Sequence, residues 1–151
     1  MCAAVLGSFE LLSESTRHEA LSRIAKKISV LKISEHFLLY GIVLSFAHSL
    51  LEEFYWRFFI YNAWKKHMHK GAWHLCAHLI SGLAFALHHF TVTVHYFDLS
   101  FGIVLGLGVW IGGVIWSYAY EKEKSLLGVW ISHILVDIAL ISIGFKALSY
   151  N

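Results

Sequence analysis

The chain has 151 residues, of which 58% are hydrophobic and only 15% are charged. Its mean hydropathy of +0.61 is too high for an ordinary water-soluble domain, and its length favours a single domain. The 12 Lys and Arg nearly balance the 10 Asp and Glu, so net charge indicates no class of partner, and we expect no nucleic acid among the partners.

The N-terminal segment has an amphipathic pattern. Between Phe9 and Ile33 apolar residues recur at helical spacing, with basic residues between them. The segment Ser13-Glu14-Ser15-Thr16 offers side chains that can cap a helix start. We therefore expect residues 1–34 to form a basic amphipathic helix on the membrane surface, with a solvent-exposed helix as the alternative.

Four long apolar segments follow, each near the roughly 20 residues that a membrane-spanning helix needs. Their approximate bounds are 35–63, 72–97, 99–120 and 126–148. The predicted fold is therefore all-α, an integral membrane bundle of four transmembrane helices preceded by an amphipathic interfacial helix. Residues 35–151 would form the four-helix core.

Two polar segments between the apolar ones are predicted to be loops, residues 64–71 and residues 121–124. Basic residues divide almost evenly between the two sides that four spans would define, so they indicate no orientation. The third span is rich in glycine, which we attribute to close packing against neighbouring spans rather than to a homodimer face.

Ionisable side chains lie inside three of the four apolar segments. Those that we consider for a functional site are Glu52, Glu53, Arg57, His89, His133 and Asp137. A charged group at membrane depth is costly unless it is paired or hydrated, so such residues indicate function. Glu53 and Arg57 are one helical turn apart and are expected to form a supporting pair. Glu52 points about 100° away from Glu53 and is the freer carboxylate.

Three short patterns occur in order on separate hydrophobic segments: Glu52-Glu53-x-x-x-Arg57, Phe85-x-x-x-His89 and His133-x-x-x-Asp137. In this order they resemble the CAAX protease and bacteriocin-processing (CPBP, or Abi) family of glutamic-type intramembrane proteases. The resemblance covers about residues 36–148. The chain departs from the family in two ways. Many members have eight helices, whereas this chain resembles the minimal four-helix catalytic core, and the third pattern often ends in Asn where this chain has Asp137.

The resemblance implies an intramembrane endopeptidase that cleaves a membrane-associated protein or peptide near its C-terminus. In the family the first glutamate and the histidine of the second pattern activate water, roles that here fall to Glu52 and His89. His133 and Asp137 would stabilise the oxyanion, Asp137 either as a protonated donor or by orienting His133.

The resemblance also implies the partners and the location. We expect membrane lipid and a peptide or protein substrate, lipidated or carrying a C-terminal sorting signal. Bacteriocin precursors and sorting signals are favoured over prenylated CAAX tails. The expected location is a prokaryotic cell membrane, as a multi-pass protein.

No cofactor is expected, although zinc stays open because histidines and a glutamate from different helices offer ligands. His74 and His78 also have a metal-compatible spacing, but the sequence identifies no third ligand beside them. One alternative function is a membrane protein that binds metal or haem, with His89 and His133 as haem ligands. The other is a non-catalytic bacteriocin-immunity protein on the same fold. Haem would leave the glutamate pair unexplained, and an immunity role would leave a costly carboxylate without a task.

Overall fold

The structure is a computed structural model that describes residues 2–68, 71, 73–96 and 99–149. Within these residues it contains helices and no strand, as the all-α prediction requires. Four helical runs of the described chain are long and apolar enough to cross a membrane: Ser34–His67, Trp73–His95, Gly102–Glu123 and Leu126–Leu148. The predicted four-span fold is thereby confirmed.

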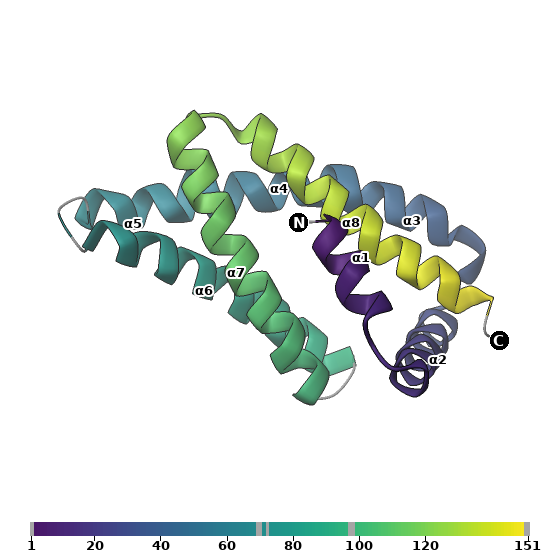
Figure 1. The fold of residues 1–151 in the computed structure, drawn as a ribbon. Coiled ribbons are helices and arrows are strands. Elements are labelled where there is room, and N and C mark those ends of the chain that lie inside the picture. Colours follow the sequence, from purple (N-terminus) through teal and green to yellow (C-terminus); the bar gives the residue numbers. More distant parts are fainter. Residues whose placement is uncertain (1, 69–70, 72, 97–98, 150–151) are drawn as a thin grey trace. The chain divides into compact units, whose positions relative to one another are not determined.

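Figure 1 follows the helices in chain order. They are α1 (Cys2–Glu10), α2 (Glu14–Val30), η1 (Ser34–His36), α3 (Phe37–Val43), η2 (Leu44–His48), α4 (Ser49–Glu53), η3 (Phe54–Tyr61), α5 (Asn62–His67), α6 (Trp73–Tyr96), α7 (Leu99–Glu123) and α8 (Leu126–Leu148).

Two helices extend beyond their predicted ends. The first span continues as α5 to His67, and α7 continues to Glu123, so both predicted loops begin too early. The added residues are mostly polar, and helical hydrogen bonds close within the backbone whether or not the side chains are apolar. Hydropathy therefore marks the apolar layer rather than the helix end. The predicted span bounds 72 and 97 and the loop residues 69–70 lie outside the described residues.

The first span is not uniformly α-helical. The π-helical segments η2 and η3 lie on either side of the α-helical segment α4, which ends with Glu52 and Glu53. π-helical turns inside α-helices are rare and are frequently found at functional sites. The glutamate pair thus occupies an unusual stretch of backbone.

The chain divides into two compact units, Met1–Ser49 with Ile131–Asn151, and Leu50–Trp130. In the first unit, Ser13 caps α2 by accepting a hydrogen bond from the backbone N–H of Thr16 at 3.3 Å. The cap begins a new helix, so the segment holds two helices rather than the single predicted one. Lys146 donates to Glu10 at 2.8 Å, and this ammonium group lowers the pKa of the Glu10 carboxyl.

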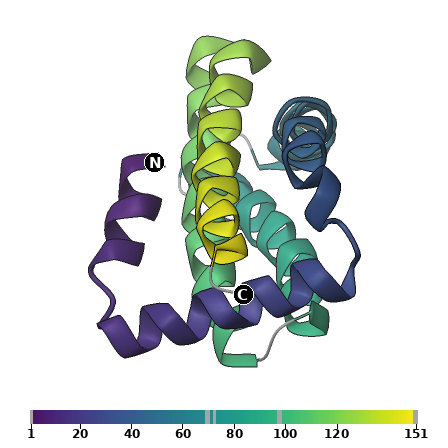
Figure 2. The same cartoon turned by 90° about the vertical axis from the view of Figure 1, so that its right-hand side faces the viewer.

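The apolar face of α2 contacts protein in the first unit. Leu21 and Ala25 form a buried cluster with Ile143 and Ala147, and α2 crosses the C-terminal end of α8 (Figure 2). This packing explains the helical spacing of the apolar residues in α2. The position of residues 1–34 on a membrane surface stays a prediction.

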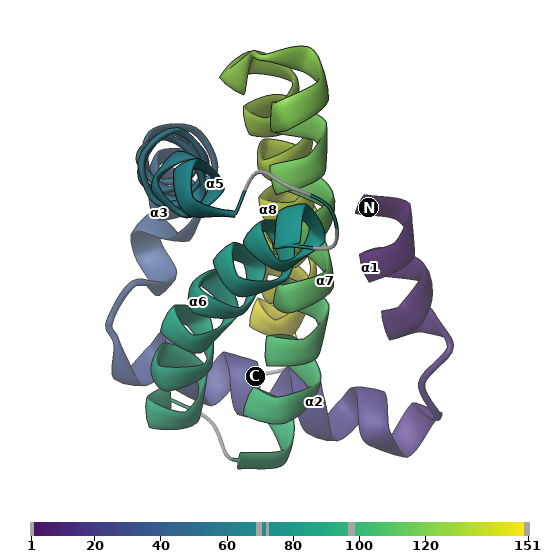
Figure 3. The same cartoon turned by 90° about the vertical axis from the view of Figure 1, so that its left-hand side faces the viewer.

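In the second unit, α6 and α7 are consecutive helices that pack along each other (Figure 3). A Cβ atom on Gly113 would lie 2.9 Å from the Cα atom of Gly82, and one on Gly102 would lie 2.4 Å from a methyl group of Val94. Both glycines of α7 therefore permit a close approach to α6. This agrees with the prediction that glycines of the third span serve packing between neighbouring spans.

Candidate active site

Glu53 and Arg57 form the buried ion pair that their spacing predicts. Arg57 Nε lies 3.1 Å from Glu53 Oε2, and the side chains are 1% and 0% exposed. The guanidinium group lies over the ring of Phe85, 4.4 Å from its centroid, and 5.2 Å from the ring centroid of Trp116. Ion pairing and cation–π contacts both compensate for the buried charge. Through its guanidinium group, Arg57 of η3 thus contacts both α6 and α7.

Glu52 and His89 come together from two different helices of the second unit. Glu52 Oε1 lies 3.7 Å from His89 Nε2, with side chains that are 9% and 31% exposed. His89 Nδ1 donates to the backbone carbonyl of Phe85 at 3.1 Å. A neutral imidazole that donates from Nδ1 carries its lone pair on Nε2, the atom nearest Glu52. One water molecule can therefore hydrogen-bond to both groups.

Phe85 contacts both Arg57 of the ion pair and His89, the partner of Glu52. Its side chain is buried, and its ring centroid lies 4.4 Å from that of His89, on the same helix. The rings of Trp56 and Trp116 also pack against Phe85 in edge-on or inclined geometry. Sequence reasoning missed both tryptophans as neighbours of the site, because periodicity does not say which apolar residues of separate helices meet.

His133 and Asp137 lie one turn apart on α8, in the first unit. His133 Nε2 is 3.6 Å from Asp137 Oδ1, with His133 buried and Asp137 half-buried. A His133 ring that carries a proton on both nitrogens can face Asp137 with Nε2–H and donate a further hydrogen bond from Nδ1. The structure thus brings together Glu52 with His89 in one unit and His133 with Asp137 in the other.

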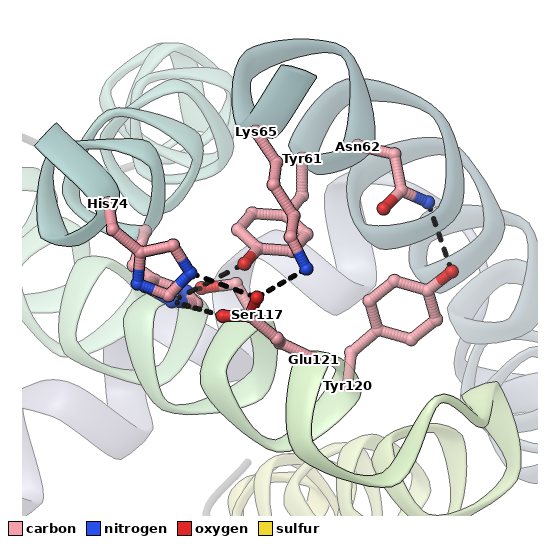
Figure 4. Close-up of polar contacts among 8 residues, drawn as sticks. Tyr61, Asn62, Lys65, His74, Ser117, Tyr120 and Glu121 are labelled. Atoms are coloured by element: carbon pink, nitrogen blue, oxygen red, sulfur yellow. Dashed lines mark hydrogen bonds and ion pairs between the residues drawn. The ribbon is translucent and has the colours of Figure 1, made fainter. Parts of the chain in front are cut away.

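A further polar cluster was not predicted. His74 and His78 of α6, Lys65 of α5 and Glu121 of α7 converge at one end of the second unit (Figure 4). Glu121 was assigned to a loop, and no pattern around it points to the histidines. The one signal in the sequence was the spacing of the two histidines.

A family of known proteins matches most of the chain. The model of the family described as type II CAAX prenyl endopeptidase, Rce1-like, matches residues 34–139. The matched segment contains all three patterns, from Glu52 to Asp137. No curated protein and no solved structure matches the chain significantly.

Proposed function

The chain belongs to the type II CAAX prenyl endopeptidase Rce1-like family, and from this membership we propose that it is a glutamic-type intramembrane endopeptidase. At the level of the family it is a CAAX-type protease, and its four apolar helical runs make it a multi-pass membrane protein. The observation that supports a catalytic role is the approach of Glu52 to His89 from separate helices.

In the proposed reaction Glu52 is the general base and His89 holds the nucleophile. A water molecule donates one hydrogen bond to Glu52 and another to the lone pair of His89 Nε2. Glu52 takes a proton from this water as its oxygen bonds to the scissile carbonyl carbon. The same proton then passes to the leaving nitrogen as the C–N bond breaks. This sequence needs no metal ion.

We assign stabilisation of the negative charge that develops on the carbonyl oxygen to the residues of the third pattern. We propose that His133 donates a hydrogen bond to this oxyanion and that Asp137 positions His133. Donors aimed at a developing charge are commonly the largest single contribution to catalysis. Glu53 and Arg57 support the site as a buried pair without touching the reacting atoms.

The proposed substrate is a membrane-associated peptide or protein that is cleaved near its C-terminus. The family description names prenyl substrates. For this chain we favour bacteriocin precursors or C-terminal sorting signals in a prokaryotic cell membrane. Membrane lipid would surround the spans and present such substrates at the right depth.

The test is peptide cleavage by the purified full chain in detergent. Wild type is compared with Glu52→Gln and His89→Ala, each with and without a chelator, on prenylated and unlipidated C-terminal peptides. The controls are Glu35→Gln and His36→Ala, which change an exposed glutamate and an exposed histidine at the start of the first span.

We expect both site variants to lose about 100-fold or more in kcat, a typical loss for general acid–base catalysis, while the controls stay near wild type. We also expect cleavage to survive the chelator. Wild-type rates in Glu52→Gln would overturn the assignment of the base. Cleavage of prenylated peptides alone would overturn the proposed substrate but keep the mechanism. A purified protein with a Soret band would instead favour the haem alternative.

A further inference from the structure

Three side chains capable of binding a metal ion meet where α6 begins and α7 ends. His74 and His78 lie one turn apart on α6, and Glu121 reaches them from α7 (Figure 4). One ligand atom from each residue lies within 4.8 Å of the other two. None of the three has a task in the proposed peptidase chemistry.

Each histidine directs its Nε2 atom at the carboxylate of Glu121. His74 Nε2 lies 2.9 Å from Glu121 Oε1, and His78 Nε2 lies 3.0 Å from Glu121 Oε2. Two imidazole nitrogens and one carboxylate are a ligand set that Zn²⁺ uses in enzymes. The sequence supplied only the histidine pair, and the structure supplies the third ligand.

The hydrogen bonds around His78 leave a lone pair directed at the carboxylate. Ser117 donates its hydroxyl hydrogen to the carbonyl of Val114 at 2.9 Å, so its oxygen accepts from His78 Nδ1, also at 2.9 Å. A neutral imidazole that donates from Nδ1 has a lone pair on Nε2. The Tyr61 hydroxyl lies 3.4 Å from Nε2 and can donate weakly to this lone pair, but the Glu121 oxygen lies closer, at 3.0 Å. Two acceptors at that distance need a proton or a metal ion between them. A donated Nδ1–H is also how metal-bound histidines are usually held.

A metal ion would reach the cluster from the side of Lys65 and His74, which are more exposed than His78. Lys65 Nζ pairs with Glu121, and its side chain is 28% exposed on a flexible stem that is able to withdraw. His74 is 40% exposed, whereas His78 is 4% exposed. The cluster is therefore open on the His74 side, where water would complete the coordination.

From these contacts we propose that His74, His78 and Glu121 bind a divalent transition-metal ion of the Zn²⁺ class. Imidazole nitrogen suits this class better than it suits Mg²⁺ or Ca²⁺. The site uses none of the residues that would activate water. Its role would be to join α6 to α7 at their polar ends, with Lys65 occupying the carboxylate when no metal is bound.

The test is direct metal binding by the purified, tag-free, metal-depleted chain. Co²⁺ is titrated while its visible d–d absorption is followed, and bound Zn²⁺ is counted by mass spectrometry. We expect one ion per chain. Affinity should fall by at least roughly 10- to 100-fold in His78→Ala and in Glu121→Gln, because even outer-shell changes cost that much. His74→Ala, at a more exposed position, is the second variant if His78→Ala fails to fold.

Two controls separate a metal site from a lysine-held ion pair. His88→Ala removes an exposed histidine of the same helix and should bind as wild type does. Lys65→Met removes the competing ammonium group, so it should bind as tightly as wild type or more tightly. Zn²⁺ should raise the melting temperature of wild type and Lys65→Met but not of His78→Ala.

No stoichiometric Co²⁺ or Zn²⁺ binding by wild type would overturn the proposal, as would binding that persists in both His78→Ala and Glu121→Gln. Loss of binding in Lys65→Met would also overturn it, because lysine cannot be both competitor and requirement. These readouts do not depend on peptide cleavage. Any chelator effect on cleavage is assigned to this site only if His78→Ala abolishes that effect.

Discussion

At the scale of single residues, two adjacent glutamates of one helix lie in different surroundings. Glu53 faces Arg57 and is fully buried, whereas Glu52 faces His89. Successive residues of a helix point about 100° apart, so one short segment supplies both a carboxylate of a buried ion pair and the carboxylate that we propose as the base. The division of roles therefore follows from helix geometry and from what each face meets.

Replacing Arg57 with Met should destabilise the protein strongly. The substitution removes the positive charge 3.1 Å from the Glu53 carboxylate and the cation that lies over Phe85. Removing one partner of a buried ion pair typically costs about 3–5 kcal/mol. We expect a loss of this order in the free energy of unfolding, measured by tryptophan fluorescence in detergent.

The control for this prediction is the double variant Glu53→Gln/Arg57→Met, which removes both charges. It should recover much of the lost stability, since replacing a whole buried pair is far less costly than breaking it. If the double variant is less stable than Arg57→Met by the full effect of Glu53→Gln alone, the two side chains are not coupled.

Contacts of the site between residues close in the sequence could be predicted, and contacts between separate helices could not be predicted from spacing. The pairs Glu53–Arg57 and His133–Asp137 follow from spacing alone, because residues one turn apart share a helix face. The approach of Glu52 to His89 joins different helices, and only the family resemblance pointed to it. For the Glu121 cluster the only signal in the sequence was the spacing of His74 and His78, and Glu121 itself was assigned to a loop.

At the scale of elements, close helix packing depends on which glycine faces a neighbour. A Cβ atom on Gly113 would lie 2.9 Å from Gly82 Cα and 3.3 Å from Gly82 O. These are backbone atoms, which cannot turn aside as a side chain would. Among the residues that the structure describes, a Cβ atom on Gly108 of the same helix would have no heavy atom within 4 Å, apart from those of its own helix turn and chain neighbours.

Gly113→Ala should therefore destabilise the contact between α6 and α7, and Gly108→Ala should not. Overpacking of a close contact typically costs about 1–3 kcal/mol. For Gly108→Ala the better helix propensity of alanine should leave stability unchanged or slightly raised. Thermal unfolding of both variants in one detergent is the measurement, and equal melting temperatures would show that the Gly82–Gly113 approach is not tight.

The elements were more predictable than their ends. Hydropathy located all four spans because each must hide its backbone from lipid in an apolar helix. It missed the polar extensions to His67 and Glu123, which lie beyond the apolar layer. It also gave no sign of η2 and η3, because a π-helical turn changes backbone hydrogen bonds without changing composition.

At the scale of the whole molecule, the count of spans fixes which segments share a side of the membrane. Large apolar side chains of α7 are well exposed, as lipid contact requires: Val104, Leu107 and Ile111. Four crossings return the chain to its starting side. The segment before the first span and the end of α8 would therefore share one side, and the α5–α6 and α7–α8 connections the other.

Single cysteines should report this topology in a background in which Cys2 and Cys76 are replaced by Ser. We expect Lys26→Cys and Ser149→Cys to react with a membrane-impermeant maleimide from one side, and Lys122→Cys from the opposite side, since an odd number of spans separates it from each. Reaction of all three from the same side of sealed vesicles would contradict four crossings. Because Lys122 follows Glu121 directly, its side also identifies the compartment from which a metal ion would reach the His74 cluster. Basic residues divide too evenly for the sequence to make that choice.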